Sequence, residues 1–434
     1  MMKPEKEIIK ESIVFFRQNI TPGIDREVSI PAFSNKVITI IGPRRVGKTH
    51  VLLQHIRRLS KHKVLPQHIL YLNLEDERIN YTQLPPDYIL QAYTELHPDV
   101  PFSKIHLFLD EIQHLPQWEK FIRRVYDTYT KHIYLTGSNS AFLQHNISTS
   151  LRGRTLSYQI FPLSFKEFLR FKNYTYTPQD LYHPRKRSLL LNLFKEYVLF
   201  GGFPEPVLSS KELRIKILQE YVNVMLYKDL IEQYHISDLT TLKFFLRRIM
   251  DSTGKVFSIH KIYNDLKSAN IKVSKNTLYD YLKYLEDVFA VFILPKHFQS
   301  PVKTELSERK IYPVDNGYLQ AYKYIQAEHY GVMLENTLRQ FFLQHEYHLF
   351  FFKDNKEVDF VCFDKKNKPH LFQVSYSLHD ADTKKREIDA LLHAARIFKV
   401  KEAYILTMED EEEITVNKLK IHIMPAYKYI LQNS

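Results

Sequence analysis

The sequence is poor in cysteine, tryptophan and glycine, with one, one and ten of these residues among 434. A single cysteine, Cys362, excludes disulfides within the chain and zinc sites built from several thiolates, and it fits a reducing cytoplasm. The 20 histidines are scattered, without a recognisable metal-binding spacing beside a carboxylate. Resident metal centres of the common cysteine and histidine types are therefore not expected.

Long hydrophobic runs are also missing. The longest apolar run covers residues 288–294, which is the length of a buried strand and far below the 18 or so residues of a membrane span. The first residues, MMKPEKE, are charged and lack the apolar region of a signal peptide. With 44% hydrophobic and 25% charged residues the composition is that of a globular protein, so we expect two to four domains, in the cytoplasm and with no membrane contact.

Acidic residues are outnumbered, which gives a net charge of +12. This excess favours a polyanionic partner such as DNA, although the sign of the charge alone does not identify one. Residues 151–200 carry nine Lys and Arg against three acids. This stretch is either a nucleic-acid contact or an ordinary solvated face.

The most informative segment is residues 42–49, which read GPRRVGKT between the β-branched run 37–41 and the helix-like run 51–56. Strand, glycine-containing loop and helix in this order are typical of a P-loop, where backbone N–H groups surround the phosphates. We expect Lys48 to neutralise the β- and γ-phosphates of ATP and Thr49 to hold Mg²⁺. The predicted nucleotide-binding residues of this segment are Gly42, Pro43, Arg44, Arg45, Val46, Gly47, Lys48, Thr49 and His50.

Two later strands end in polar residues. Residues 105–111 read IHLFLDE, in which Asp110 is placed to hold Mg²⁺ and Glu111 to activate water for attack on the γ-phosphate. The alternative for this acidic pair is a helix N-cap. The strand at 132–135 ends in TGSN, where Ser138 or Asn139 could contact the γ-phosphate or the attacking water, or simply form a turn.

Hydrophobic periodicity predicts an α/β protein with four parts. Residues 1–160 alternate strands and helices, which predicts a parallel P-loop NTPase sheet with ATP at the carboxyl ends of its strands. Residues 161–240 predict a helical lid that the Gly201-Gly202-Phe203-Pro204 turn interrupts. Residues 241–312 resemble a winged helix, and residues 313–434 predict a small α/β domain.

The winged-helix prediction rests on residues 274–285. Ser274 is a plausible N-cap, and the apolar positions would leave Lys275, Asn276, Tyr279 and Lys283 facing outward, as on a helix that enters the major groove. Residues 288–294 and 296–303 would then form the wing. Such modules also pack against proteins or contribute to nucleotide clamps, so DNA binding is one of several possible uses.

Taken together, the chain resembles prokaryotic AAA-type ATPases that carry an uncharacterised, restriction-endonuclease-like C-terminal domain. The segments that support the resemblance, over nearly the whole length, are residues 42–49, LDEIQ at 109–113 with Trp118, TGS at 136–138, LRGR at 151–154, PLSF at 162–165 and GGFP at 201–204. The resemblance implies ATP binding and an ATPase fold. It implies no substrate beyond ATP, because the cellular process of the family is mostly unassigned.

In restriction-endonuclease-like folds a helix Glu, a strand Asp and a following acid-x-Lys pair hold Mg²⁺ and activate water. By this resemblance Glu335 and Asp359 have the first two roles, while Gln373 and Ser375 stand at the third ligand and the lysine. Serine lacks the lysine's charge, so we expect a degenerate site without nuclease activity, unless Lys384 or Lys385 reaches it. The two acids could equally be ordinary surface or salt-bridged residues.

The function predicted from the sequence is Mg²⁺-dependent ATP hydrolysis. Arg152 and Arg154 are candidates for charge stabilisation at the γ-phosphate, from the same chain or a neighbouring subunit. ATP hydrolysis could drive a DNA-associated machine or a switch that acts through a protein partner of the C-terminal domain; a third possibility is an ATP-regulated nuclease. The oligomeric state does not follow from the sequence.

Overall fold

The computed structural model describes residues 5–18, 23–81, 83–139, 151, 153–298, 300–305, 308–322 and 329–434. The chain divides into two compact units: unit 1 comprises residues 1–160 together with 287–289, and unit 2 comprises residues 161–286 and 290–434. The further division of residues 161–434 at 240 and 312 stays a prediction. Among the helices of the described ranges, none combines the length and apolar character that a membrane crossing requires.

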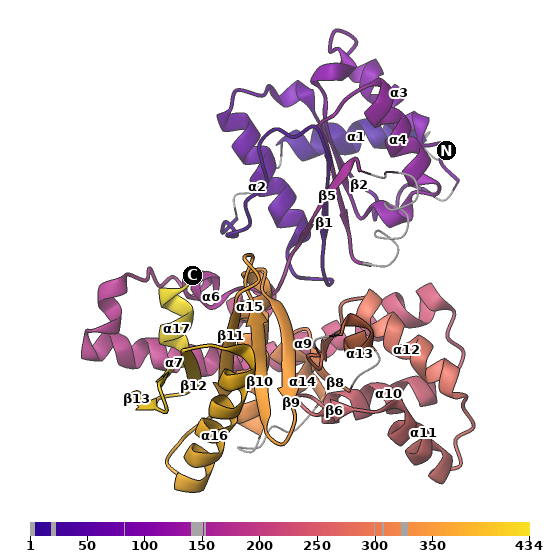
Figure 1. Cartoon of the computed structure of the whole chain (residues 1–434). Helices are drawn as coiled ribbons and strands as arrows, with labels where there is room; N and C mark the ends of the chain where they lie inside the picture. The colour runs from indigo at the N-terminus through magenta and orange to yellow at the C-terminus, as the bar shows by residue number, and fades with distance from the viewer. Residues whose placement is uncertain are drawn as a thin grey trace. The chain divides into compact units, whose positions relative to one another are not determined.

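Unit 1 is a parallel α/β sheet with helices on its faces (Figure 1). Its elements are α1 (Glu5–Gln18), β1 (Val37–Ile41), α2 (Lys48–Lys61), β2 (Ile69–Asn73), α3 (Asp87–Leu96), β3 (His106–Asp110), α4 (Trp118–Thr128), β4 (Ile133–Gly137) and β5 (Thr155–Gln159). The strands lie in the order β2-β3-β4-β1-β5, and all neighbours are parallel. Continuous burial of β1, β3 and β4 explains their uninterrupted apolar sequences.

Pairing in this sheet brings distant segments together. Strand β4 lies between β1 and β3, with Ile41 opposite Gly137 and Leu109 opposite Leu135. The carboxyl ends of the three strands therefore lie at one edge of the sheet.

Unit 2 begins with helices: α6 (Phe165–Phe171), α7 (Pro184–Phe200), α8 (Pro204–Leu208), α9 (Lys211–Val224) and the π-helix η5 (Met225–Glu232). A capping box starts α6, in which the Glu167 amide donates to Ser164 Oγ and the Ser164 amide donates to the Glu167 carboxylate. The predicted break at Gly201 occurs: α7 ends at Phe200 and Gly201 has φ 76°.

The next elements are α10 (Leu239–Asp251), β6 (Val256–Phe257), α11 (Ile259–Ser268), α12 (Lys275–Asp287), β7 (Val291–Pro295), α13 (Pro301–Glu305) and β8 (Arg309–Pro313). Their three strands form an antiparallel sheet in the order β6-β8-β7. The Thr277 amide donates to Ser274 Oγ, as a cap of α12 requires. The sequence analysis placed the second part of the wing at 296–303, and this placement was wrong. Residues 301–305 form helix α13, and the strand that pairs with β7 is β8.

The last elements are α14 (Asn316–Tyr322), α15 (Tyr330–Gln344), β9 (His348–Lys353), β10 (Glu357–Phe363), β11 (Pro369–Val374), α16 (Ala381–Phe398), β12 (Glu402–Thr407), β13 (Glu412–Val416), β14 (Leu419–Pro425) and α17 (Ala426–Gln432). Their sheet has the order β13-β14-β12-β11-β10-β9. Leu371 and Ile405 face α16, whereas Phe342 of α15 packs on Phe372 from the opposite side. The sheet is therefore covered on both faces.

Candidate active site

The phosphate loop connects β1 to α2 in a backbone conformation that needs glycine at two points. Gly42 has φ 153°, and a Cβ there would lie 2.4 Å from the Ile160 carbonyl oxygen. Gly47, just before α2, has φ 97°. The buried Arg26 supports the turn from outside by donating to the Val46 carbonyl at 2.7 Å. The loop is thus fixed by conformation and by packing.

Lys48 lies inside this loop and is 4% exposed. Its Nζ donates to the carbonyl oxygens of Gly42 at 3.2 Å and Pro43 at 3.1 Å. It also lies 3.3 Å from Oε1 of Glu111. A buried ammonium group is thus held at the loop by two carbonyls and one carboxylate.

Asp110 at the end of β3 joins three segments. Its Oδ2 accepts hydrogen bonds from Thr49 Oγ1 at 2.7 Å and Tyr71 OH at 3.0 Å, and its Oδ1 accepts from Thr136 Oγ1. Burial raises the pKa of Asp110, as does the charge of Glu111, while these hydrogen bonds lower it. Thr49 and Asp110 bring two hard oxygen donors together, and such a pair fits Mg²⁺.

Glu111 follows in the left-handed region, with φ 55°. Its amide donates to Thr136 Oγ1 at 2.8 Å, and its Oε2 accepts from Gln113 Nε2 at 2.7 Å. Burial alone would raise the pKa of Glu111, but Lys48 and Gln113 outweigh it and the pKa is lowered. The group is therefore a carboxylate at neutral pH, fixed beside the phosphate loop.

Ser138 lies at the tip of β4 and joins the same cluster, because Gln113 Nε2 donates to its Oγ at 3.3 Å. Asn139, the next residue, is also buried. The structure thus brings Lys48, Thr49, Asp110, Glu111 and Ser138 together at one edge of the sheet.

Sequence reasoning gave no role to Tyr71, Gln113, Thr136 or Arg26. Tyr71 lies in the predicted strand at 69–74, and Gln113 and Thr136 lie within quoted motifs. Thr136 offered a signal, since it begins the polar tip of a strand expected beside β1. The sequence gives no signal for Arg26, because its hydrogen-bond partners depend on how the folded chain packs.

The remaining predicted residues lie farther out. Arg44 pairs with Glu75 at 2.8 Å, and Arg45 and His50 are exposed. The prediction that Arg154 of the same chain stabilises the γ-phosphate was wrong. It precedes Thr155, which pairs with Val37 at the amino end of β1, so the length of the strand, ~13 Å, separates it from the loop. Its guanidinium instead pairs with Asp127 at 3.3 Å. Arg152 lies outside the described residues.

The predicted residues of the C-terminal domain form a second cluster, in unit 2. Glu335 and Asp359 both contact the ammonium group of Lys310, at 3.2 and 3.3 Å. Gln373, predicted as a third cation ligand, makes other contacts: its Oε1 accepts the Asp359 amide at 3.0 Å, and its Nε2 donates to the Glu357 carbonyl and the Glu387 carboxylate. Lys384 pairs with Glu412 instead of reaching this cluster.

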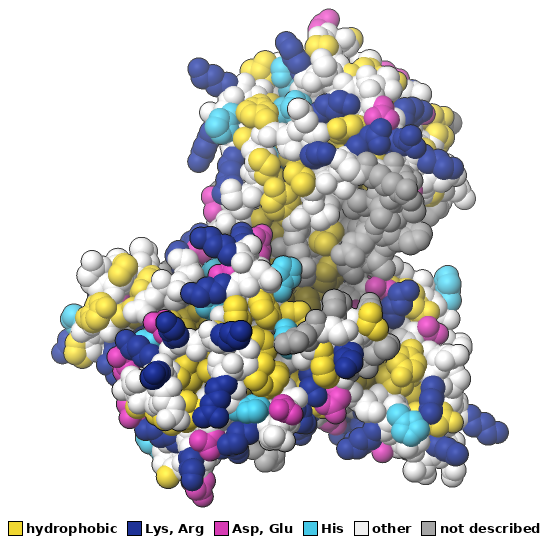
Figure 2. All heavy atoms as spheres, in the orientation of Figure 1, with side chains coloured by type: hydrophobic (Ala, Val, Ile, Leu, Met, Phe, Trp, Pro, Cys, Tyr) yellow, Lys and Arg dark blue, Asp and Glu magenta, His cyan; other side chains and the backbone are white. Residues whose placement is uncertain are grey.

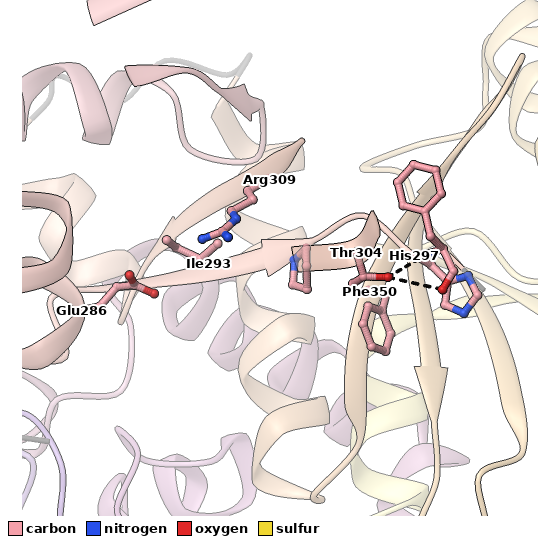
Figure 3. A pocket seen from close by; sticks show the side chains of 8 residues that line it. Glu286, Ile293, His297, Thr304, Arg309 and Phe350 are labelled. Atoms are coloured by element: carbon pink, nitrogen blue, oxygen red, sulfur yellow. Dashed lines mark hydrogen bonds between the residues drawn. The ribbon is translucent and has the colours of Figure 1, made fainter. Parts of the chain in front are cut away.

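A hollow of about 620 Å³ lies elsewhere in unit 2, beside β7 and β9 (Figure 3). Ile293, His297, Arg309 and Phe350 are among the residues that line it, and Thr304 Oγ1 closes one side through hydrogen bonds to the backbone of Phe298. None of the predicted site residues lines this hollow.

The sheet order, the phosphate loop after β1 and the acidic pair at the carboxyl end of β3 define a P-loop domain of the AAA type. In agreement, residues 34–169 match the model of a family described as an AAA domain. Residues 191–329 match a domain of unknown function, DUF8612.

The chain belongs to the family of the uncharacterized protein MJ1544 of Methanocaldococcus jannaschii, to which it is 34% identical over 98% of this chain and 96% of that protein. An uncharacterized protein of Haemophilus influenzae is 30% identical, over 83% of this chain and 86% of the relative. The first relative, like the second, has no described activity.

Among solved structures, similar chains include Orc1 of Aeropyrum pernix in complex with DNA, with 15% identity, a TM-score of 0.30, and coverage of 72% of this chain and 88% of that chain. AMPPCP-bound DnaA from Aquifex aeolicus is another, with 15% identity, a TM-score of 0.26 and coverage of 66% and 89%. At TM-scores this low, neither likeness identifies an activity or a partner for this chain.

Proposed function

We propose that the protein is a Mg²⁺-dependent ATPase in which Glu111 activates the attacking water. The observation that supports this most directly is the position of the Glu111 carboxylate, 3.3 Å from the phosphate-loop lysine and next to the Thr49–Asp110 pair. A carboxylate there can accept a proton from water close to the γ-phosphate. Ser138, joined to Gln113, would help to orient that water.

Bound Mg²⁺ would be held by Thr49 and Asp110 and would neutralise charge on the β- and γ-phosphates. The chain's own contribution is electrostatic and positional. Lys48 is shared between loop carbonyls and Glu111, so phosphates that attract its ammonium group would weaken its hold on Glu111. The carboxylate would then become a better proton acceptor when ATP is bound.

The test is Glu111→Gln, which keeps the size of the side chain and the contact with Gln113. We expect ATP binding to persist and hydrolysis to fall by roughly 10²-fold or more, because the general base is lost. Lys48→Ala should weaken binding itself, and Glu119→Gln on α4 of the same unit serves as the matched control. Hydrolysis at the parent rate in Glu111→Gln would remove Glu111 from this role.

For the process that uses the ATPase, we propose DNA association through α12. The order of helices and strands over 239–313, with the returning strand β8 between β6 and β7, supports a winged-helix assignment. Lys275, Tyr279 and Lys283 are exposed on α12. The stretch 151–200 gives weaker support than its charge suggested, since Lys172 pairs with Glu196 and Lys186 with Asp180.

The visible face in Figure 2 has Lys and Arg side chains spread among acidic ones over both units, so net charge alone does not place a DNA site. We expect duplex DNA to bind with a steep negative salt dependence, and Lys275→Ala with Lys283→Ala to reduce the slope by up to ~2. Lys356→Ala with Lys365→Ala, at two turns of the C-terminal sheet, is the matched control. Absence of binding at low salt, with and without a non-hydrolysable ATP analogue, would instead favour the protein-partner switch.

A further inference from the structure

The acid cluster of unit 2 contains an ammonium group that the nuclease-like pattern does not include. Lys310 Nζ lies 2.9 Å from Glu357 Oε1, 3.2 Å from Glu335 Oε1 and 3.3 Å from Asp359 Oδ1. Tyr312 OH donates to the same oxygen of Glu335. One lysine thus contacts three carboxylates that come from two later elements.

Strand geometry explains how the cluster forms. Lys310 and Tyr312 are two positions apart on β8 and point to the same side, and the same holds for Glu357 and Asp359 on β10. Glu335 reaches the cluster from α15. The three-stranded sheet thereby supplies the cation for acids on helix α15 and strand β10.

The environment of Lys310 argues against a catalytic role. Its side chain is 3% exposed, whereas those of Glu335 and Asp359 are 12% and 15% exposed. A lysine that assists phosphodiester cleavage has to touch the phosphate, and this one is enclosed by its carboxylates. Gln373, the remaining ligand candidate, uses its carbonyl oxygen to hold the backbone at Asp359.

We propose that Lys310 is a built-in cation that occupies the place where a divalent metal ion would bind between Glu335 and Asp359. The C-terminal α/β domain is therefore a scaffold that needs no metal ion, because Lys310 neutralises the acids that a metal ion would otherwise neutralise. Across the part of the chain that the structure describes, no group of three or more His, Cys, Asp or Glu side chains is arranged to hold a metal ion, this cluster included.

Charge balance gives the physical reason. Burial disfavours the charged form of Lys310, but Glu335 and Asp359 outweigh it and raise the pKa of Lys310 well above its ordinary value. Burial also raises the pKa of Glu335, with Lys310 acting in the opposite direction and Asp359 adding to the rise. Without the ammonium group the acids would repel one another in a poorly solvated site, and a divalent cation would relieve that repulsion.

The experiment measures Mn²⁺ binding by electron paramagnetic resonance and thermal unfolding on the full-length, nucleotide-free protein. Lys310→Ala should lower Tm by at least ~5 °C, gain one Mn²⁺ site, and recover part of its Tm when Mn²⁺ is added. Asp359→Asn in the Lys310→Ala background should abolish the gained site. Lys353→Ala removes a surface ion pair to the same Glu357, at 3.6 Å, and is the matched control with little expected change in Tm.

If Lys310→Ala does not fold, the parent protein and Asp359→Asn still test the proposal. The parent protein and Asp359→Asn should then bind equal amounts of Mn²⁺, and both should leave plasmid and single-stranded DNA uncut. The proposal is overturned if the parent binds a Mn²⁺ ion that Asp359→Asn loses, if Asp359→Ala removes a metal-dependent nicking activity, or if Lys310→Ala folds with unchanged Tm and no new site.

Discussion

Two histidines of unit 1, His55 and His106, are held neutral by burial. Both ring nitrogens of His55 are buried without a hydrogen-bond partner, and its ring lies 4.5 Å from that of Tyr134. His106 stacks on His132 at 4.5 Å. Burial lowers the pKa of His55 to about 4 and that of His106 to about 3, with smaller contributions from Arg58 at His55 and from neighbouring histidines at His106. Protonation of these rings is therefore linked to unfolding.

This linkage predicts acid sensitivity. The unfolded chain binds a proton on each histidine near pH 6.5, whereas the folded chain binds one on His55 only near pH 4, so stability is full above pH 6.5 and decreases as pH falls towards 4. The loss for His55 alone is roughly 3 kcal/mol. Denaturant unfolding between pH 7.5 and 5 measures the part of this loss that falls in that range, roughly 2 kcal/mol. His55→Leu should flatten the pH dependence and the exposed His379→Gln should not; equal slopes in all three proteins would contradict this account.

At the residue scale, the sequence predicted the groups whose chemistry is local. Gly42, Gly47, Lys48 and Thr49 follow from a loop that has to wrap phosphate, and Asp110 follows from a strand that ends in acids. Tyr71, which helps to orient Asp110, was not predictable, because its contact depends on the lateral order of strands that are far apart in sequence. Thr136 offered one signal, its position at the polar tip of β4, but its hydrogen bond to Asp110 did not follow from that position.

At the scale of elements, apolar strands such as β1, β3 and β4 were recognised because burial on both faces leaves a continuous hydrophobic run. Strand β8 was missed. Its sequence, RKIYP, carries two basic residues and a proline, and these are tolerated because Lys310 is neutralised by acids that come 25 and 49 residues later. A pattern within one segment does not contain that information.

The turn between α7 and α8 allows a sharp test of element geometry. Gly201 has φ 76°, and a Cβ there would lie 1.7 Å from Asp315 Oδ1, whose carboxylate accepts the amides of Gly202 and Gly317 at 2.8 and 2.7 Å. Gly201→Ala should therefore destabilise unit 2 by ~2 kcal/mol or more.

Gly331→Ala is the control for this substitution, since a methyl group added there would meet no atom within 4 Å and alanine favours the helix α15. Chemical denaturation compares the two variants, with binding of a fluorescent ATP analogue as a check that unit 1 is intact. If both variants unfold at the parent's denaturant concentration, the turn does not depend on glycine.

At the scale of the whole molecule, the predicted α/β class and the P-loop sheet are confirmed by the five parallel strands of unit 1 and by the match to an AAA domain. The prediction for the C-terminal part was less complete. Its alternating strands and helices were visible in the sequence. The ion pairs of Glu335 and Asp359, however, lead to Lys310, which lies outside the predicted domain of residues 313–434.

Strand β8 has a consequence for the evolution of such chains. Residues 309–313 complete one sheet by pairing with β6 and β7, yet Lys310 and Tyr312 contact acids of α15 and β10 in the domain that follows. A gene rearrangement that transferred residues 313–434 alone would carry Glu335 and Asp359 without their counter-charge. The two sheets are therefore expected to be inherited as one block, and lineages that lose Lys310 should replace one of the acids at the same time.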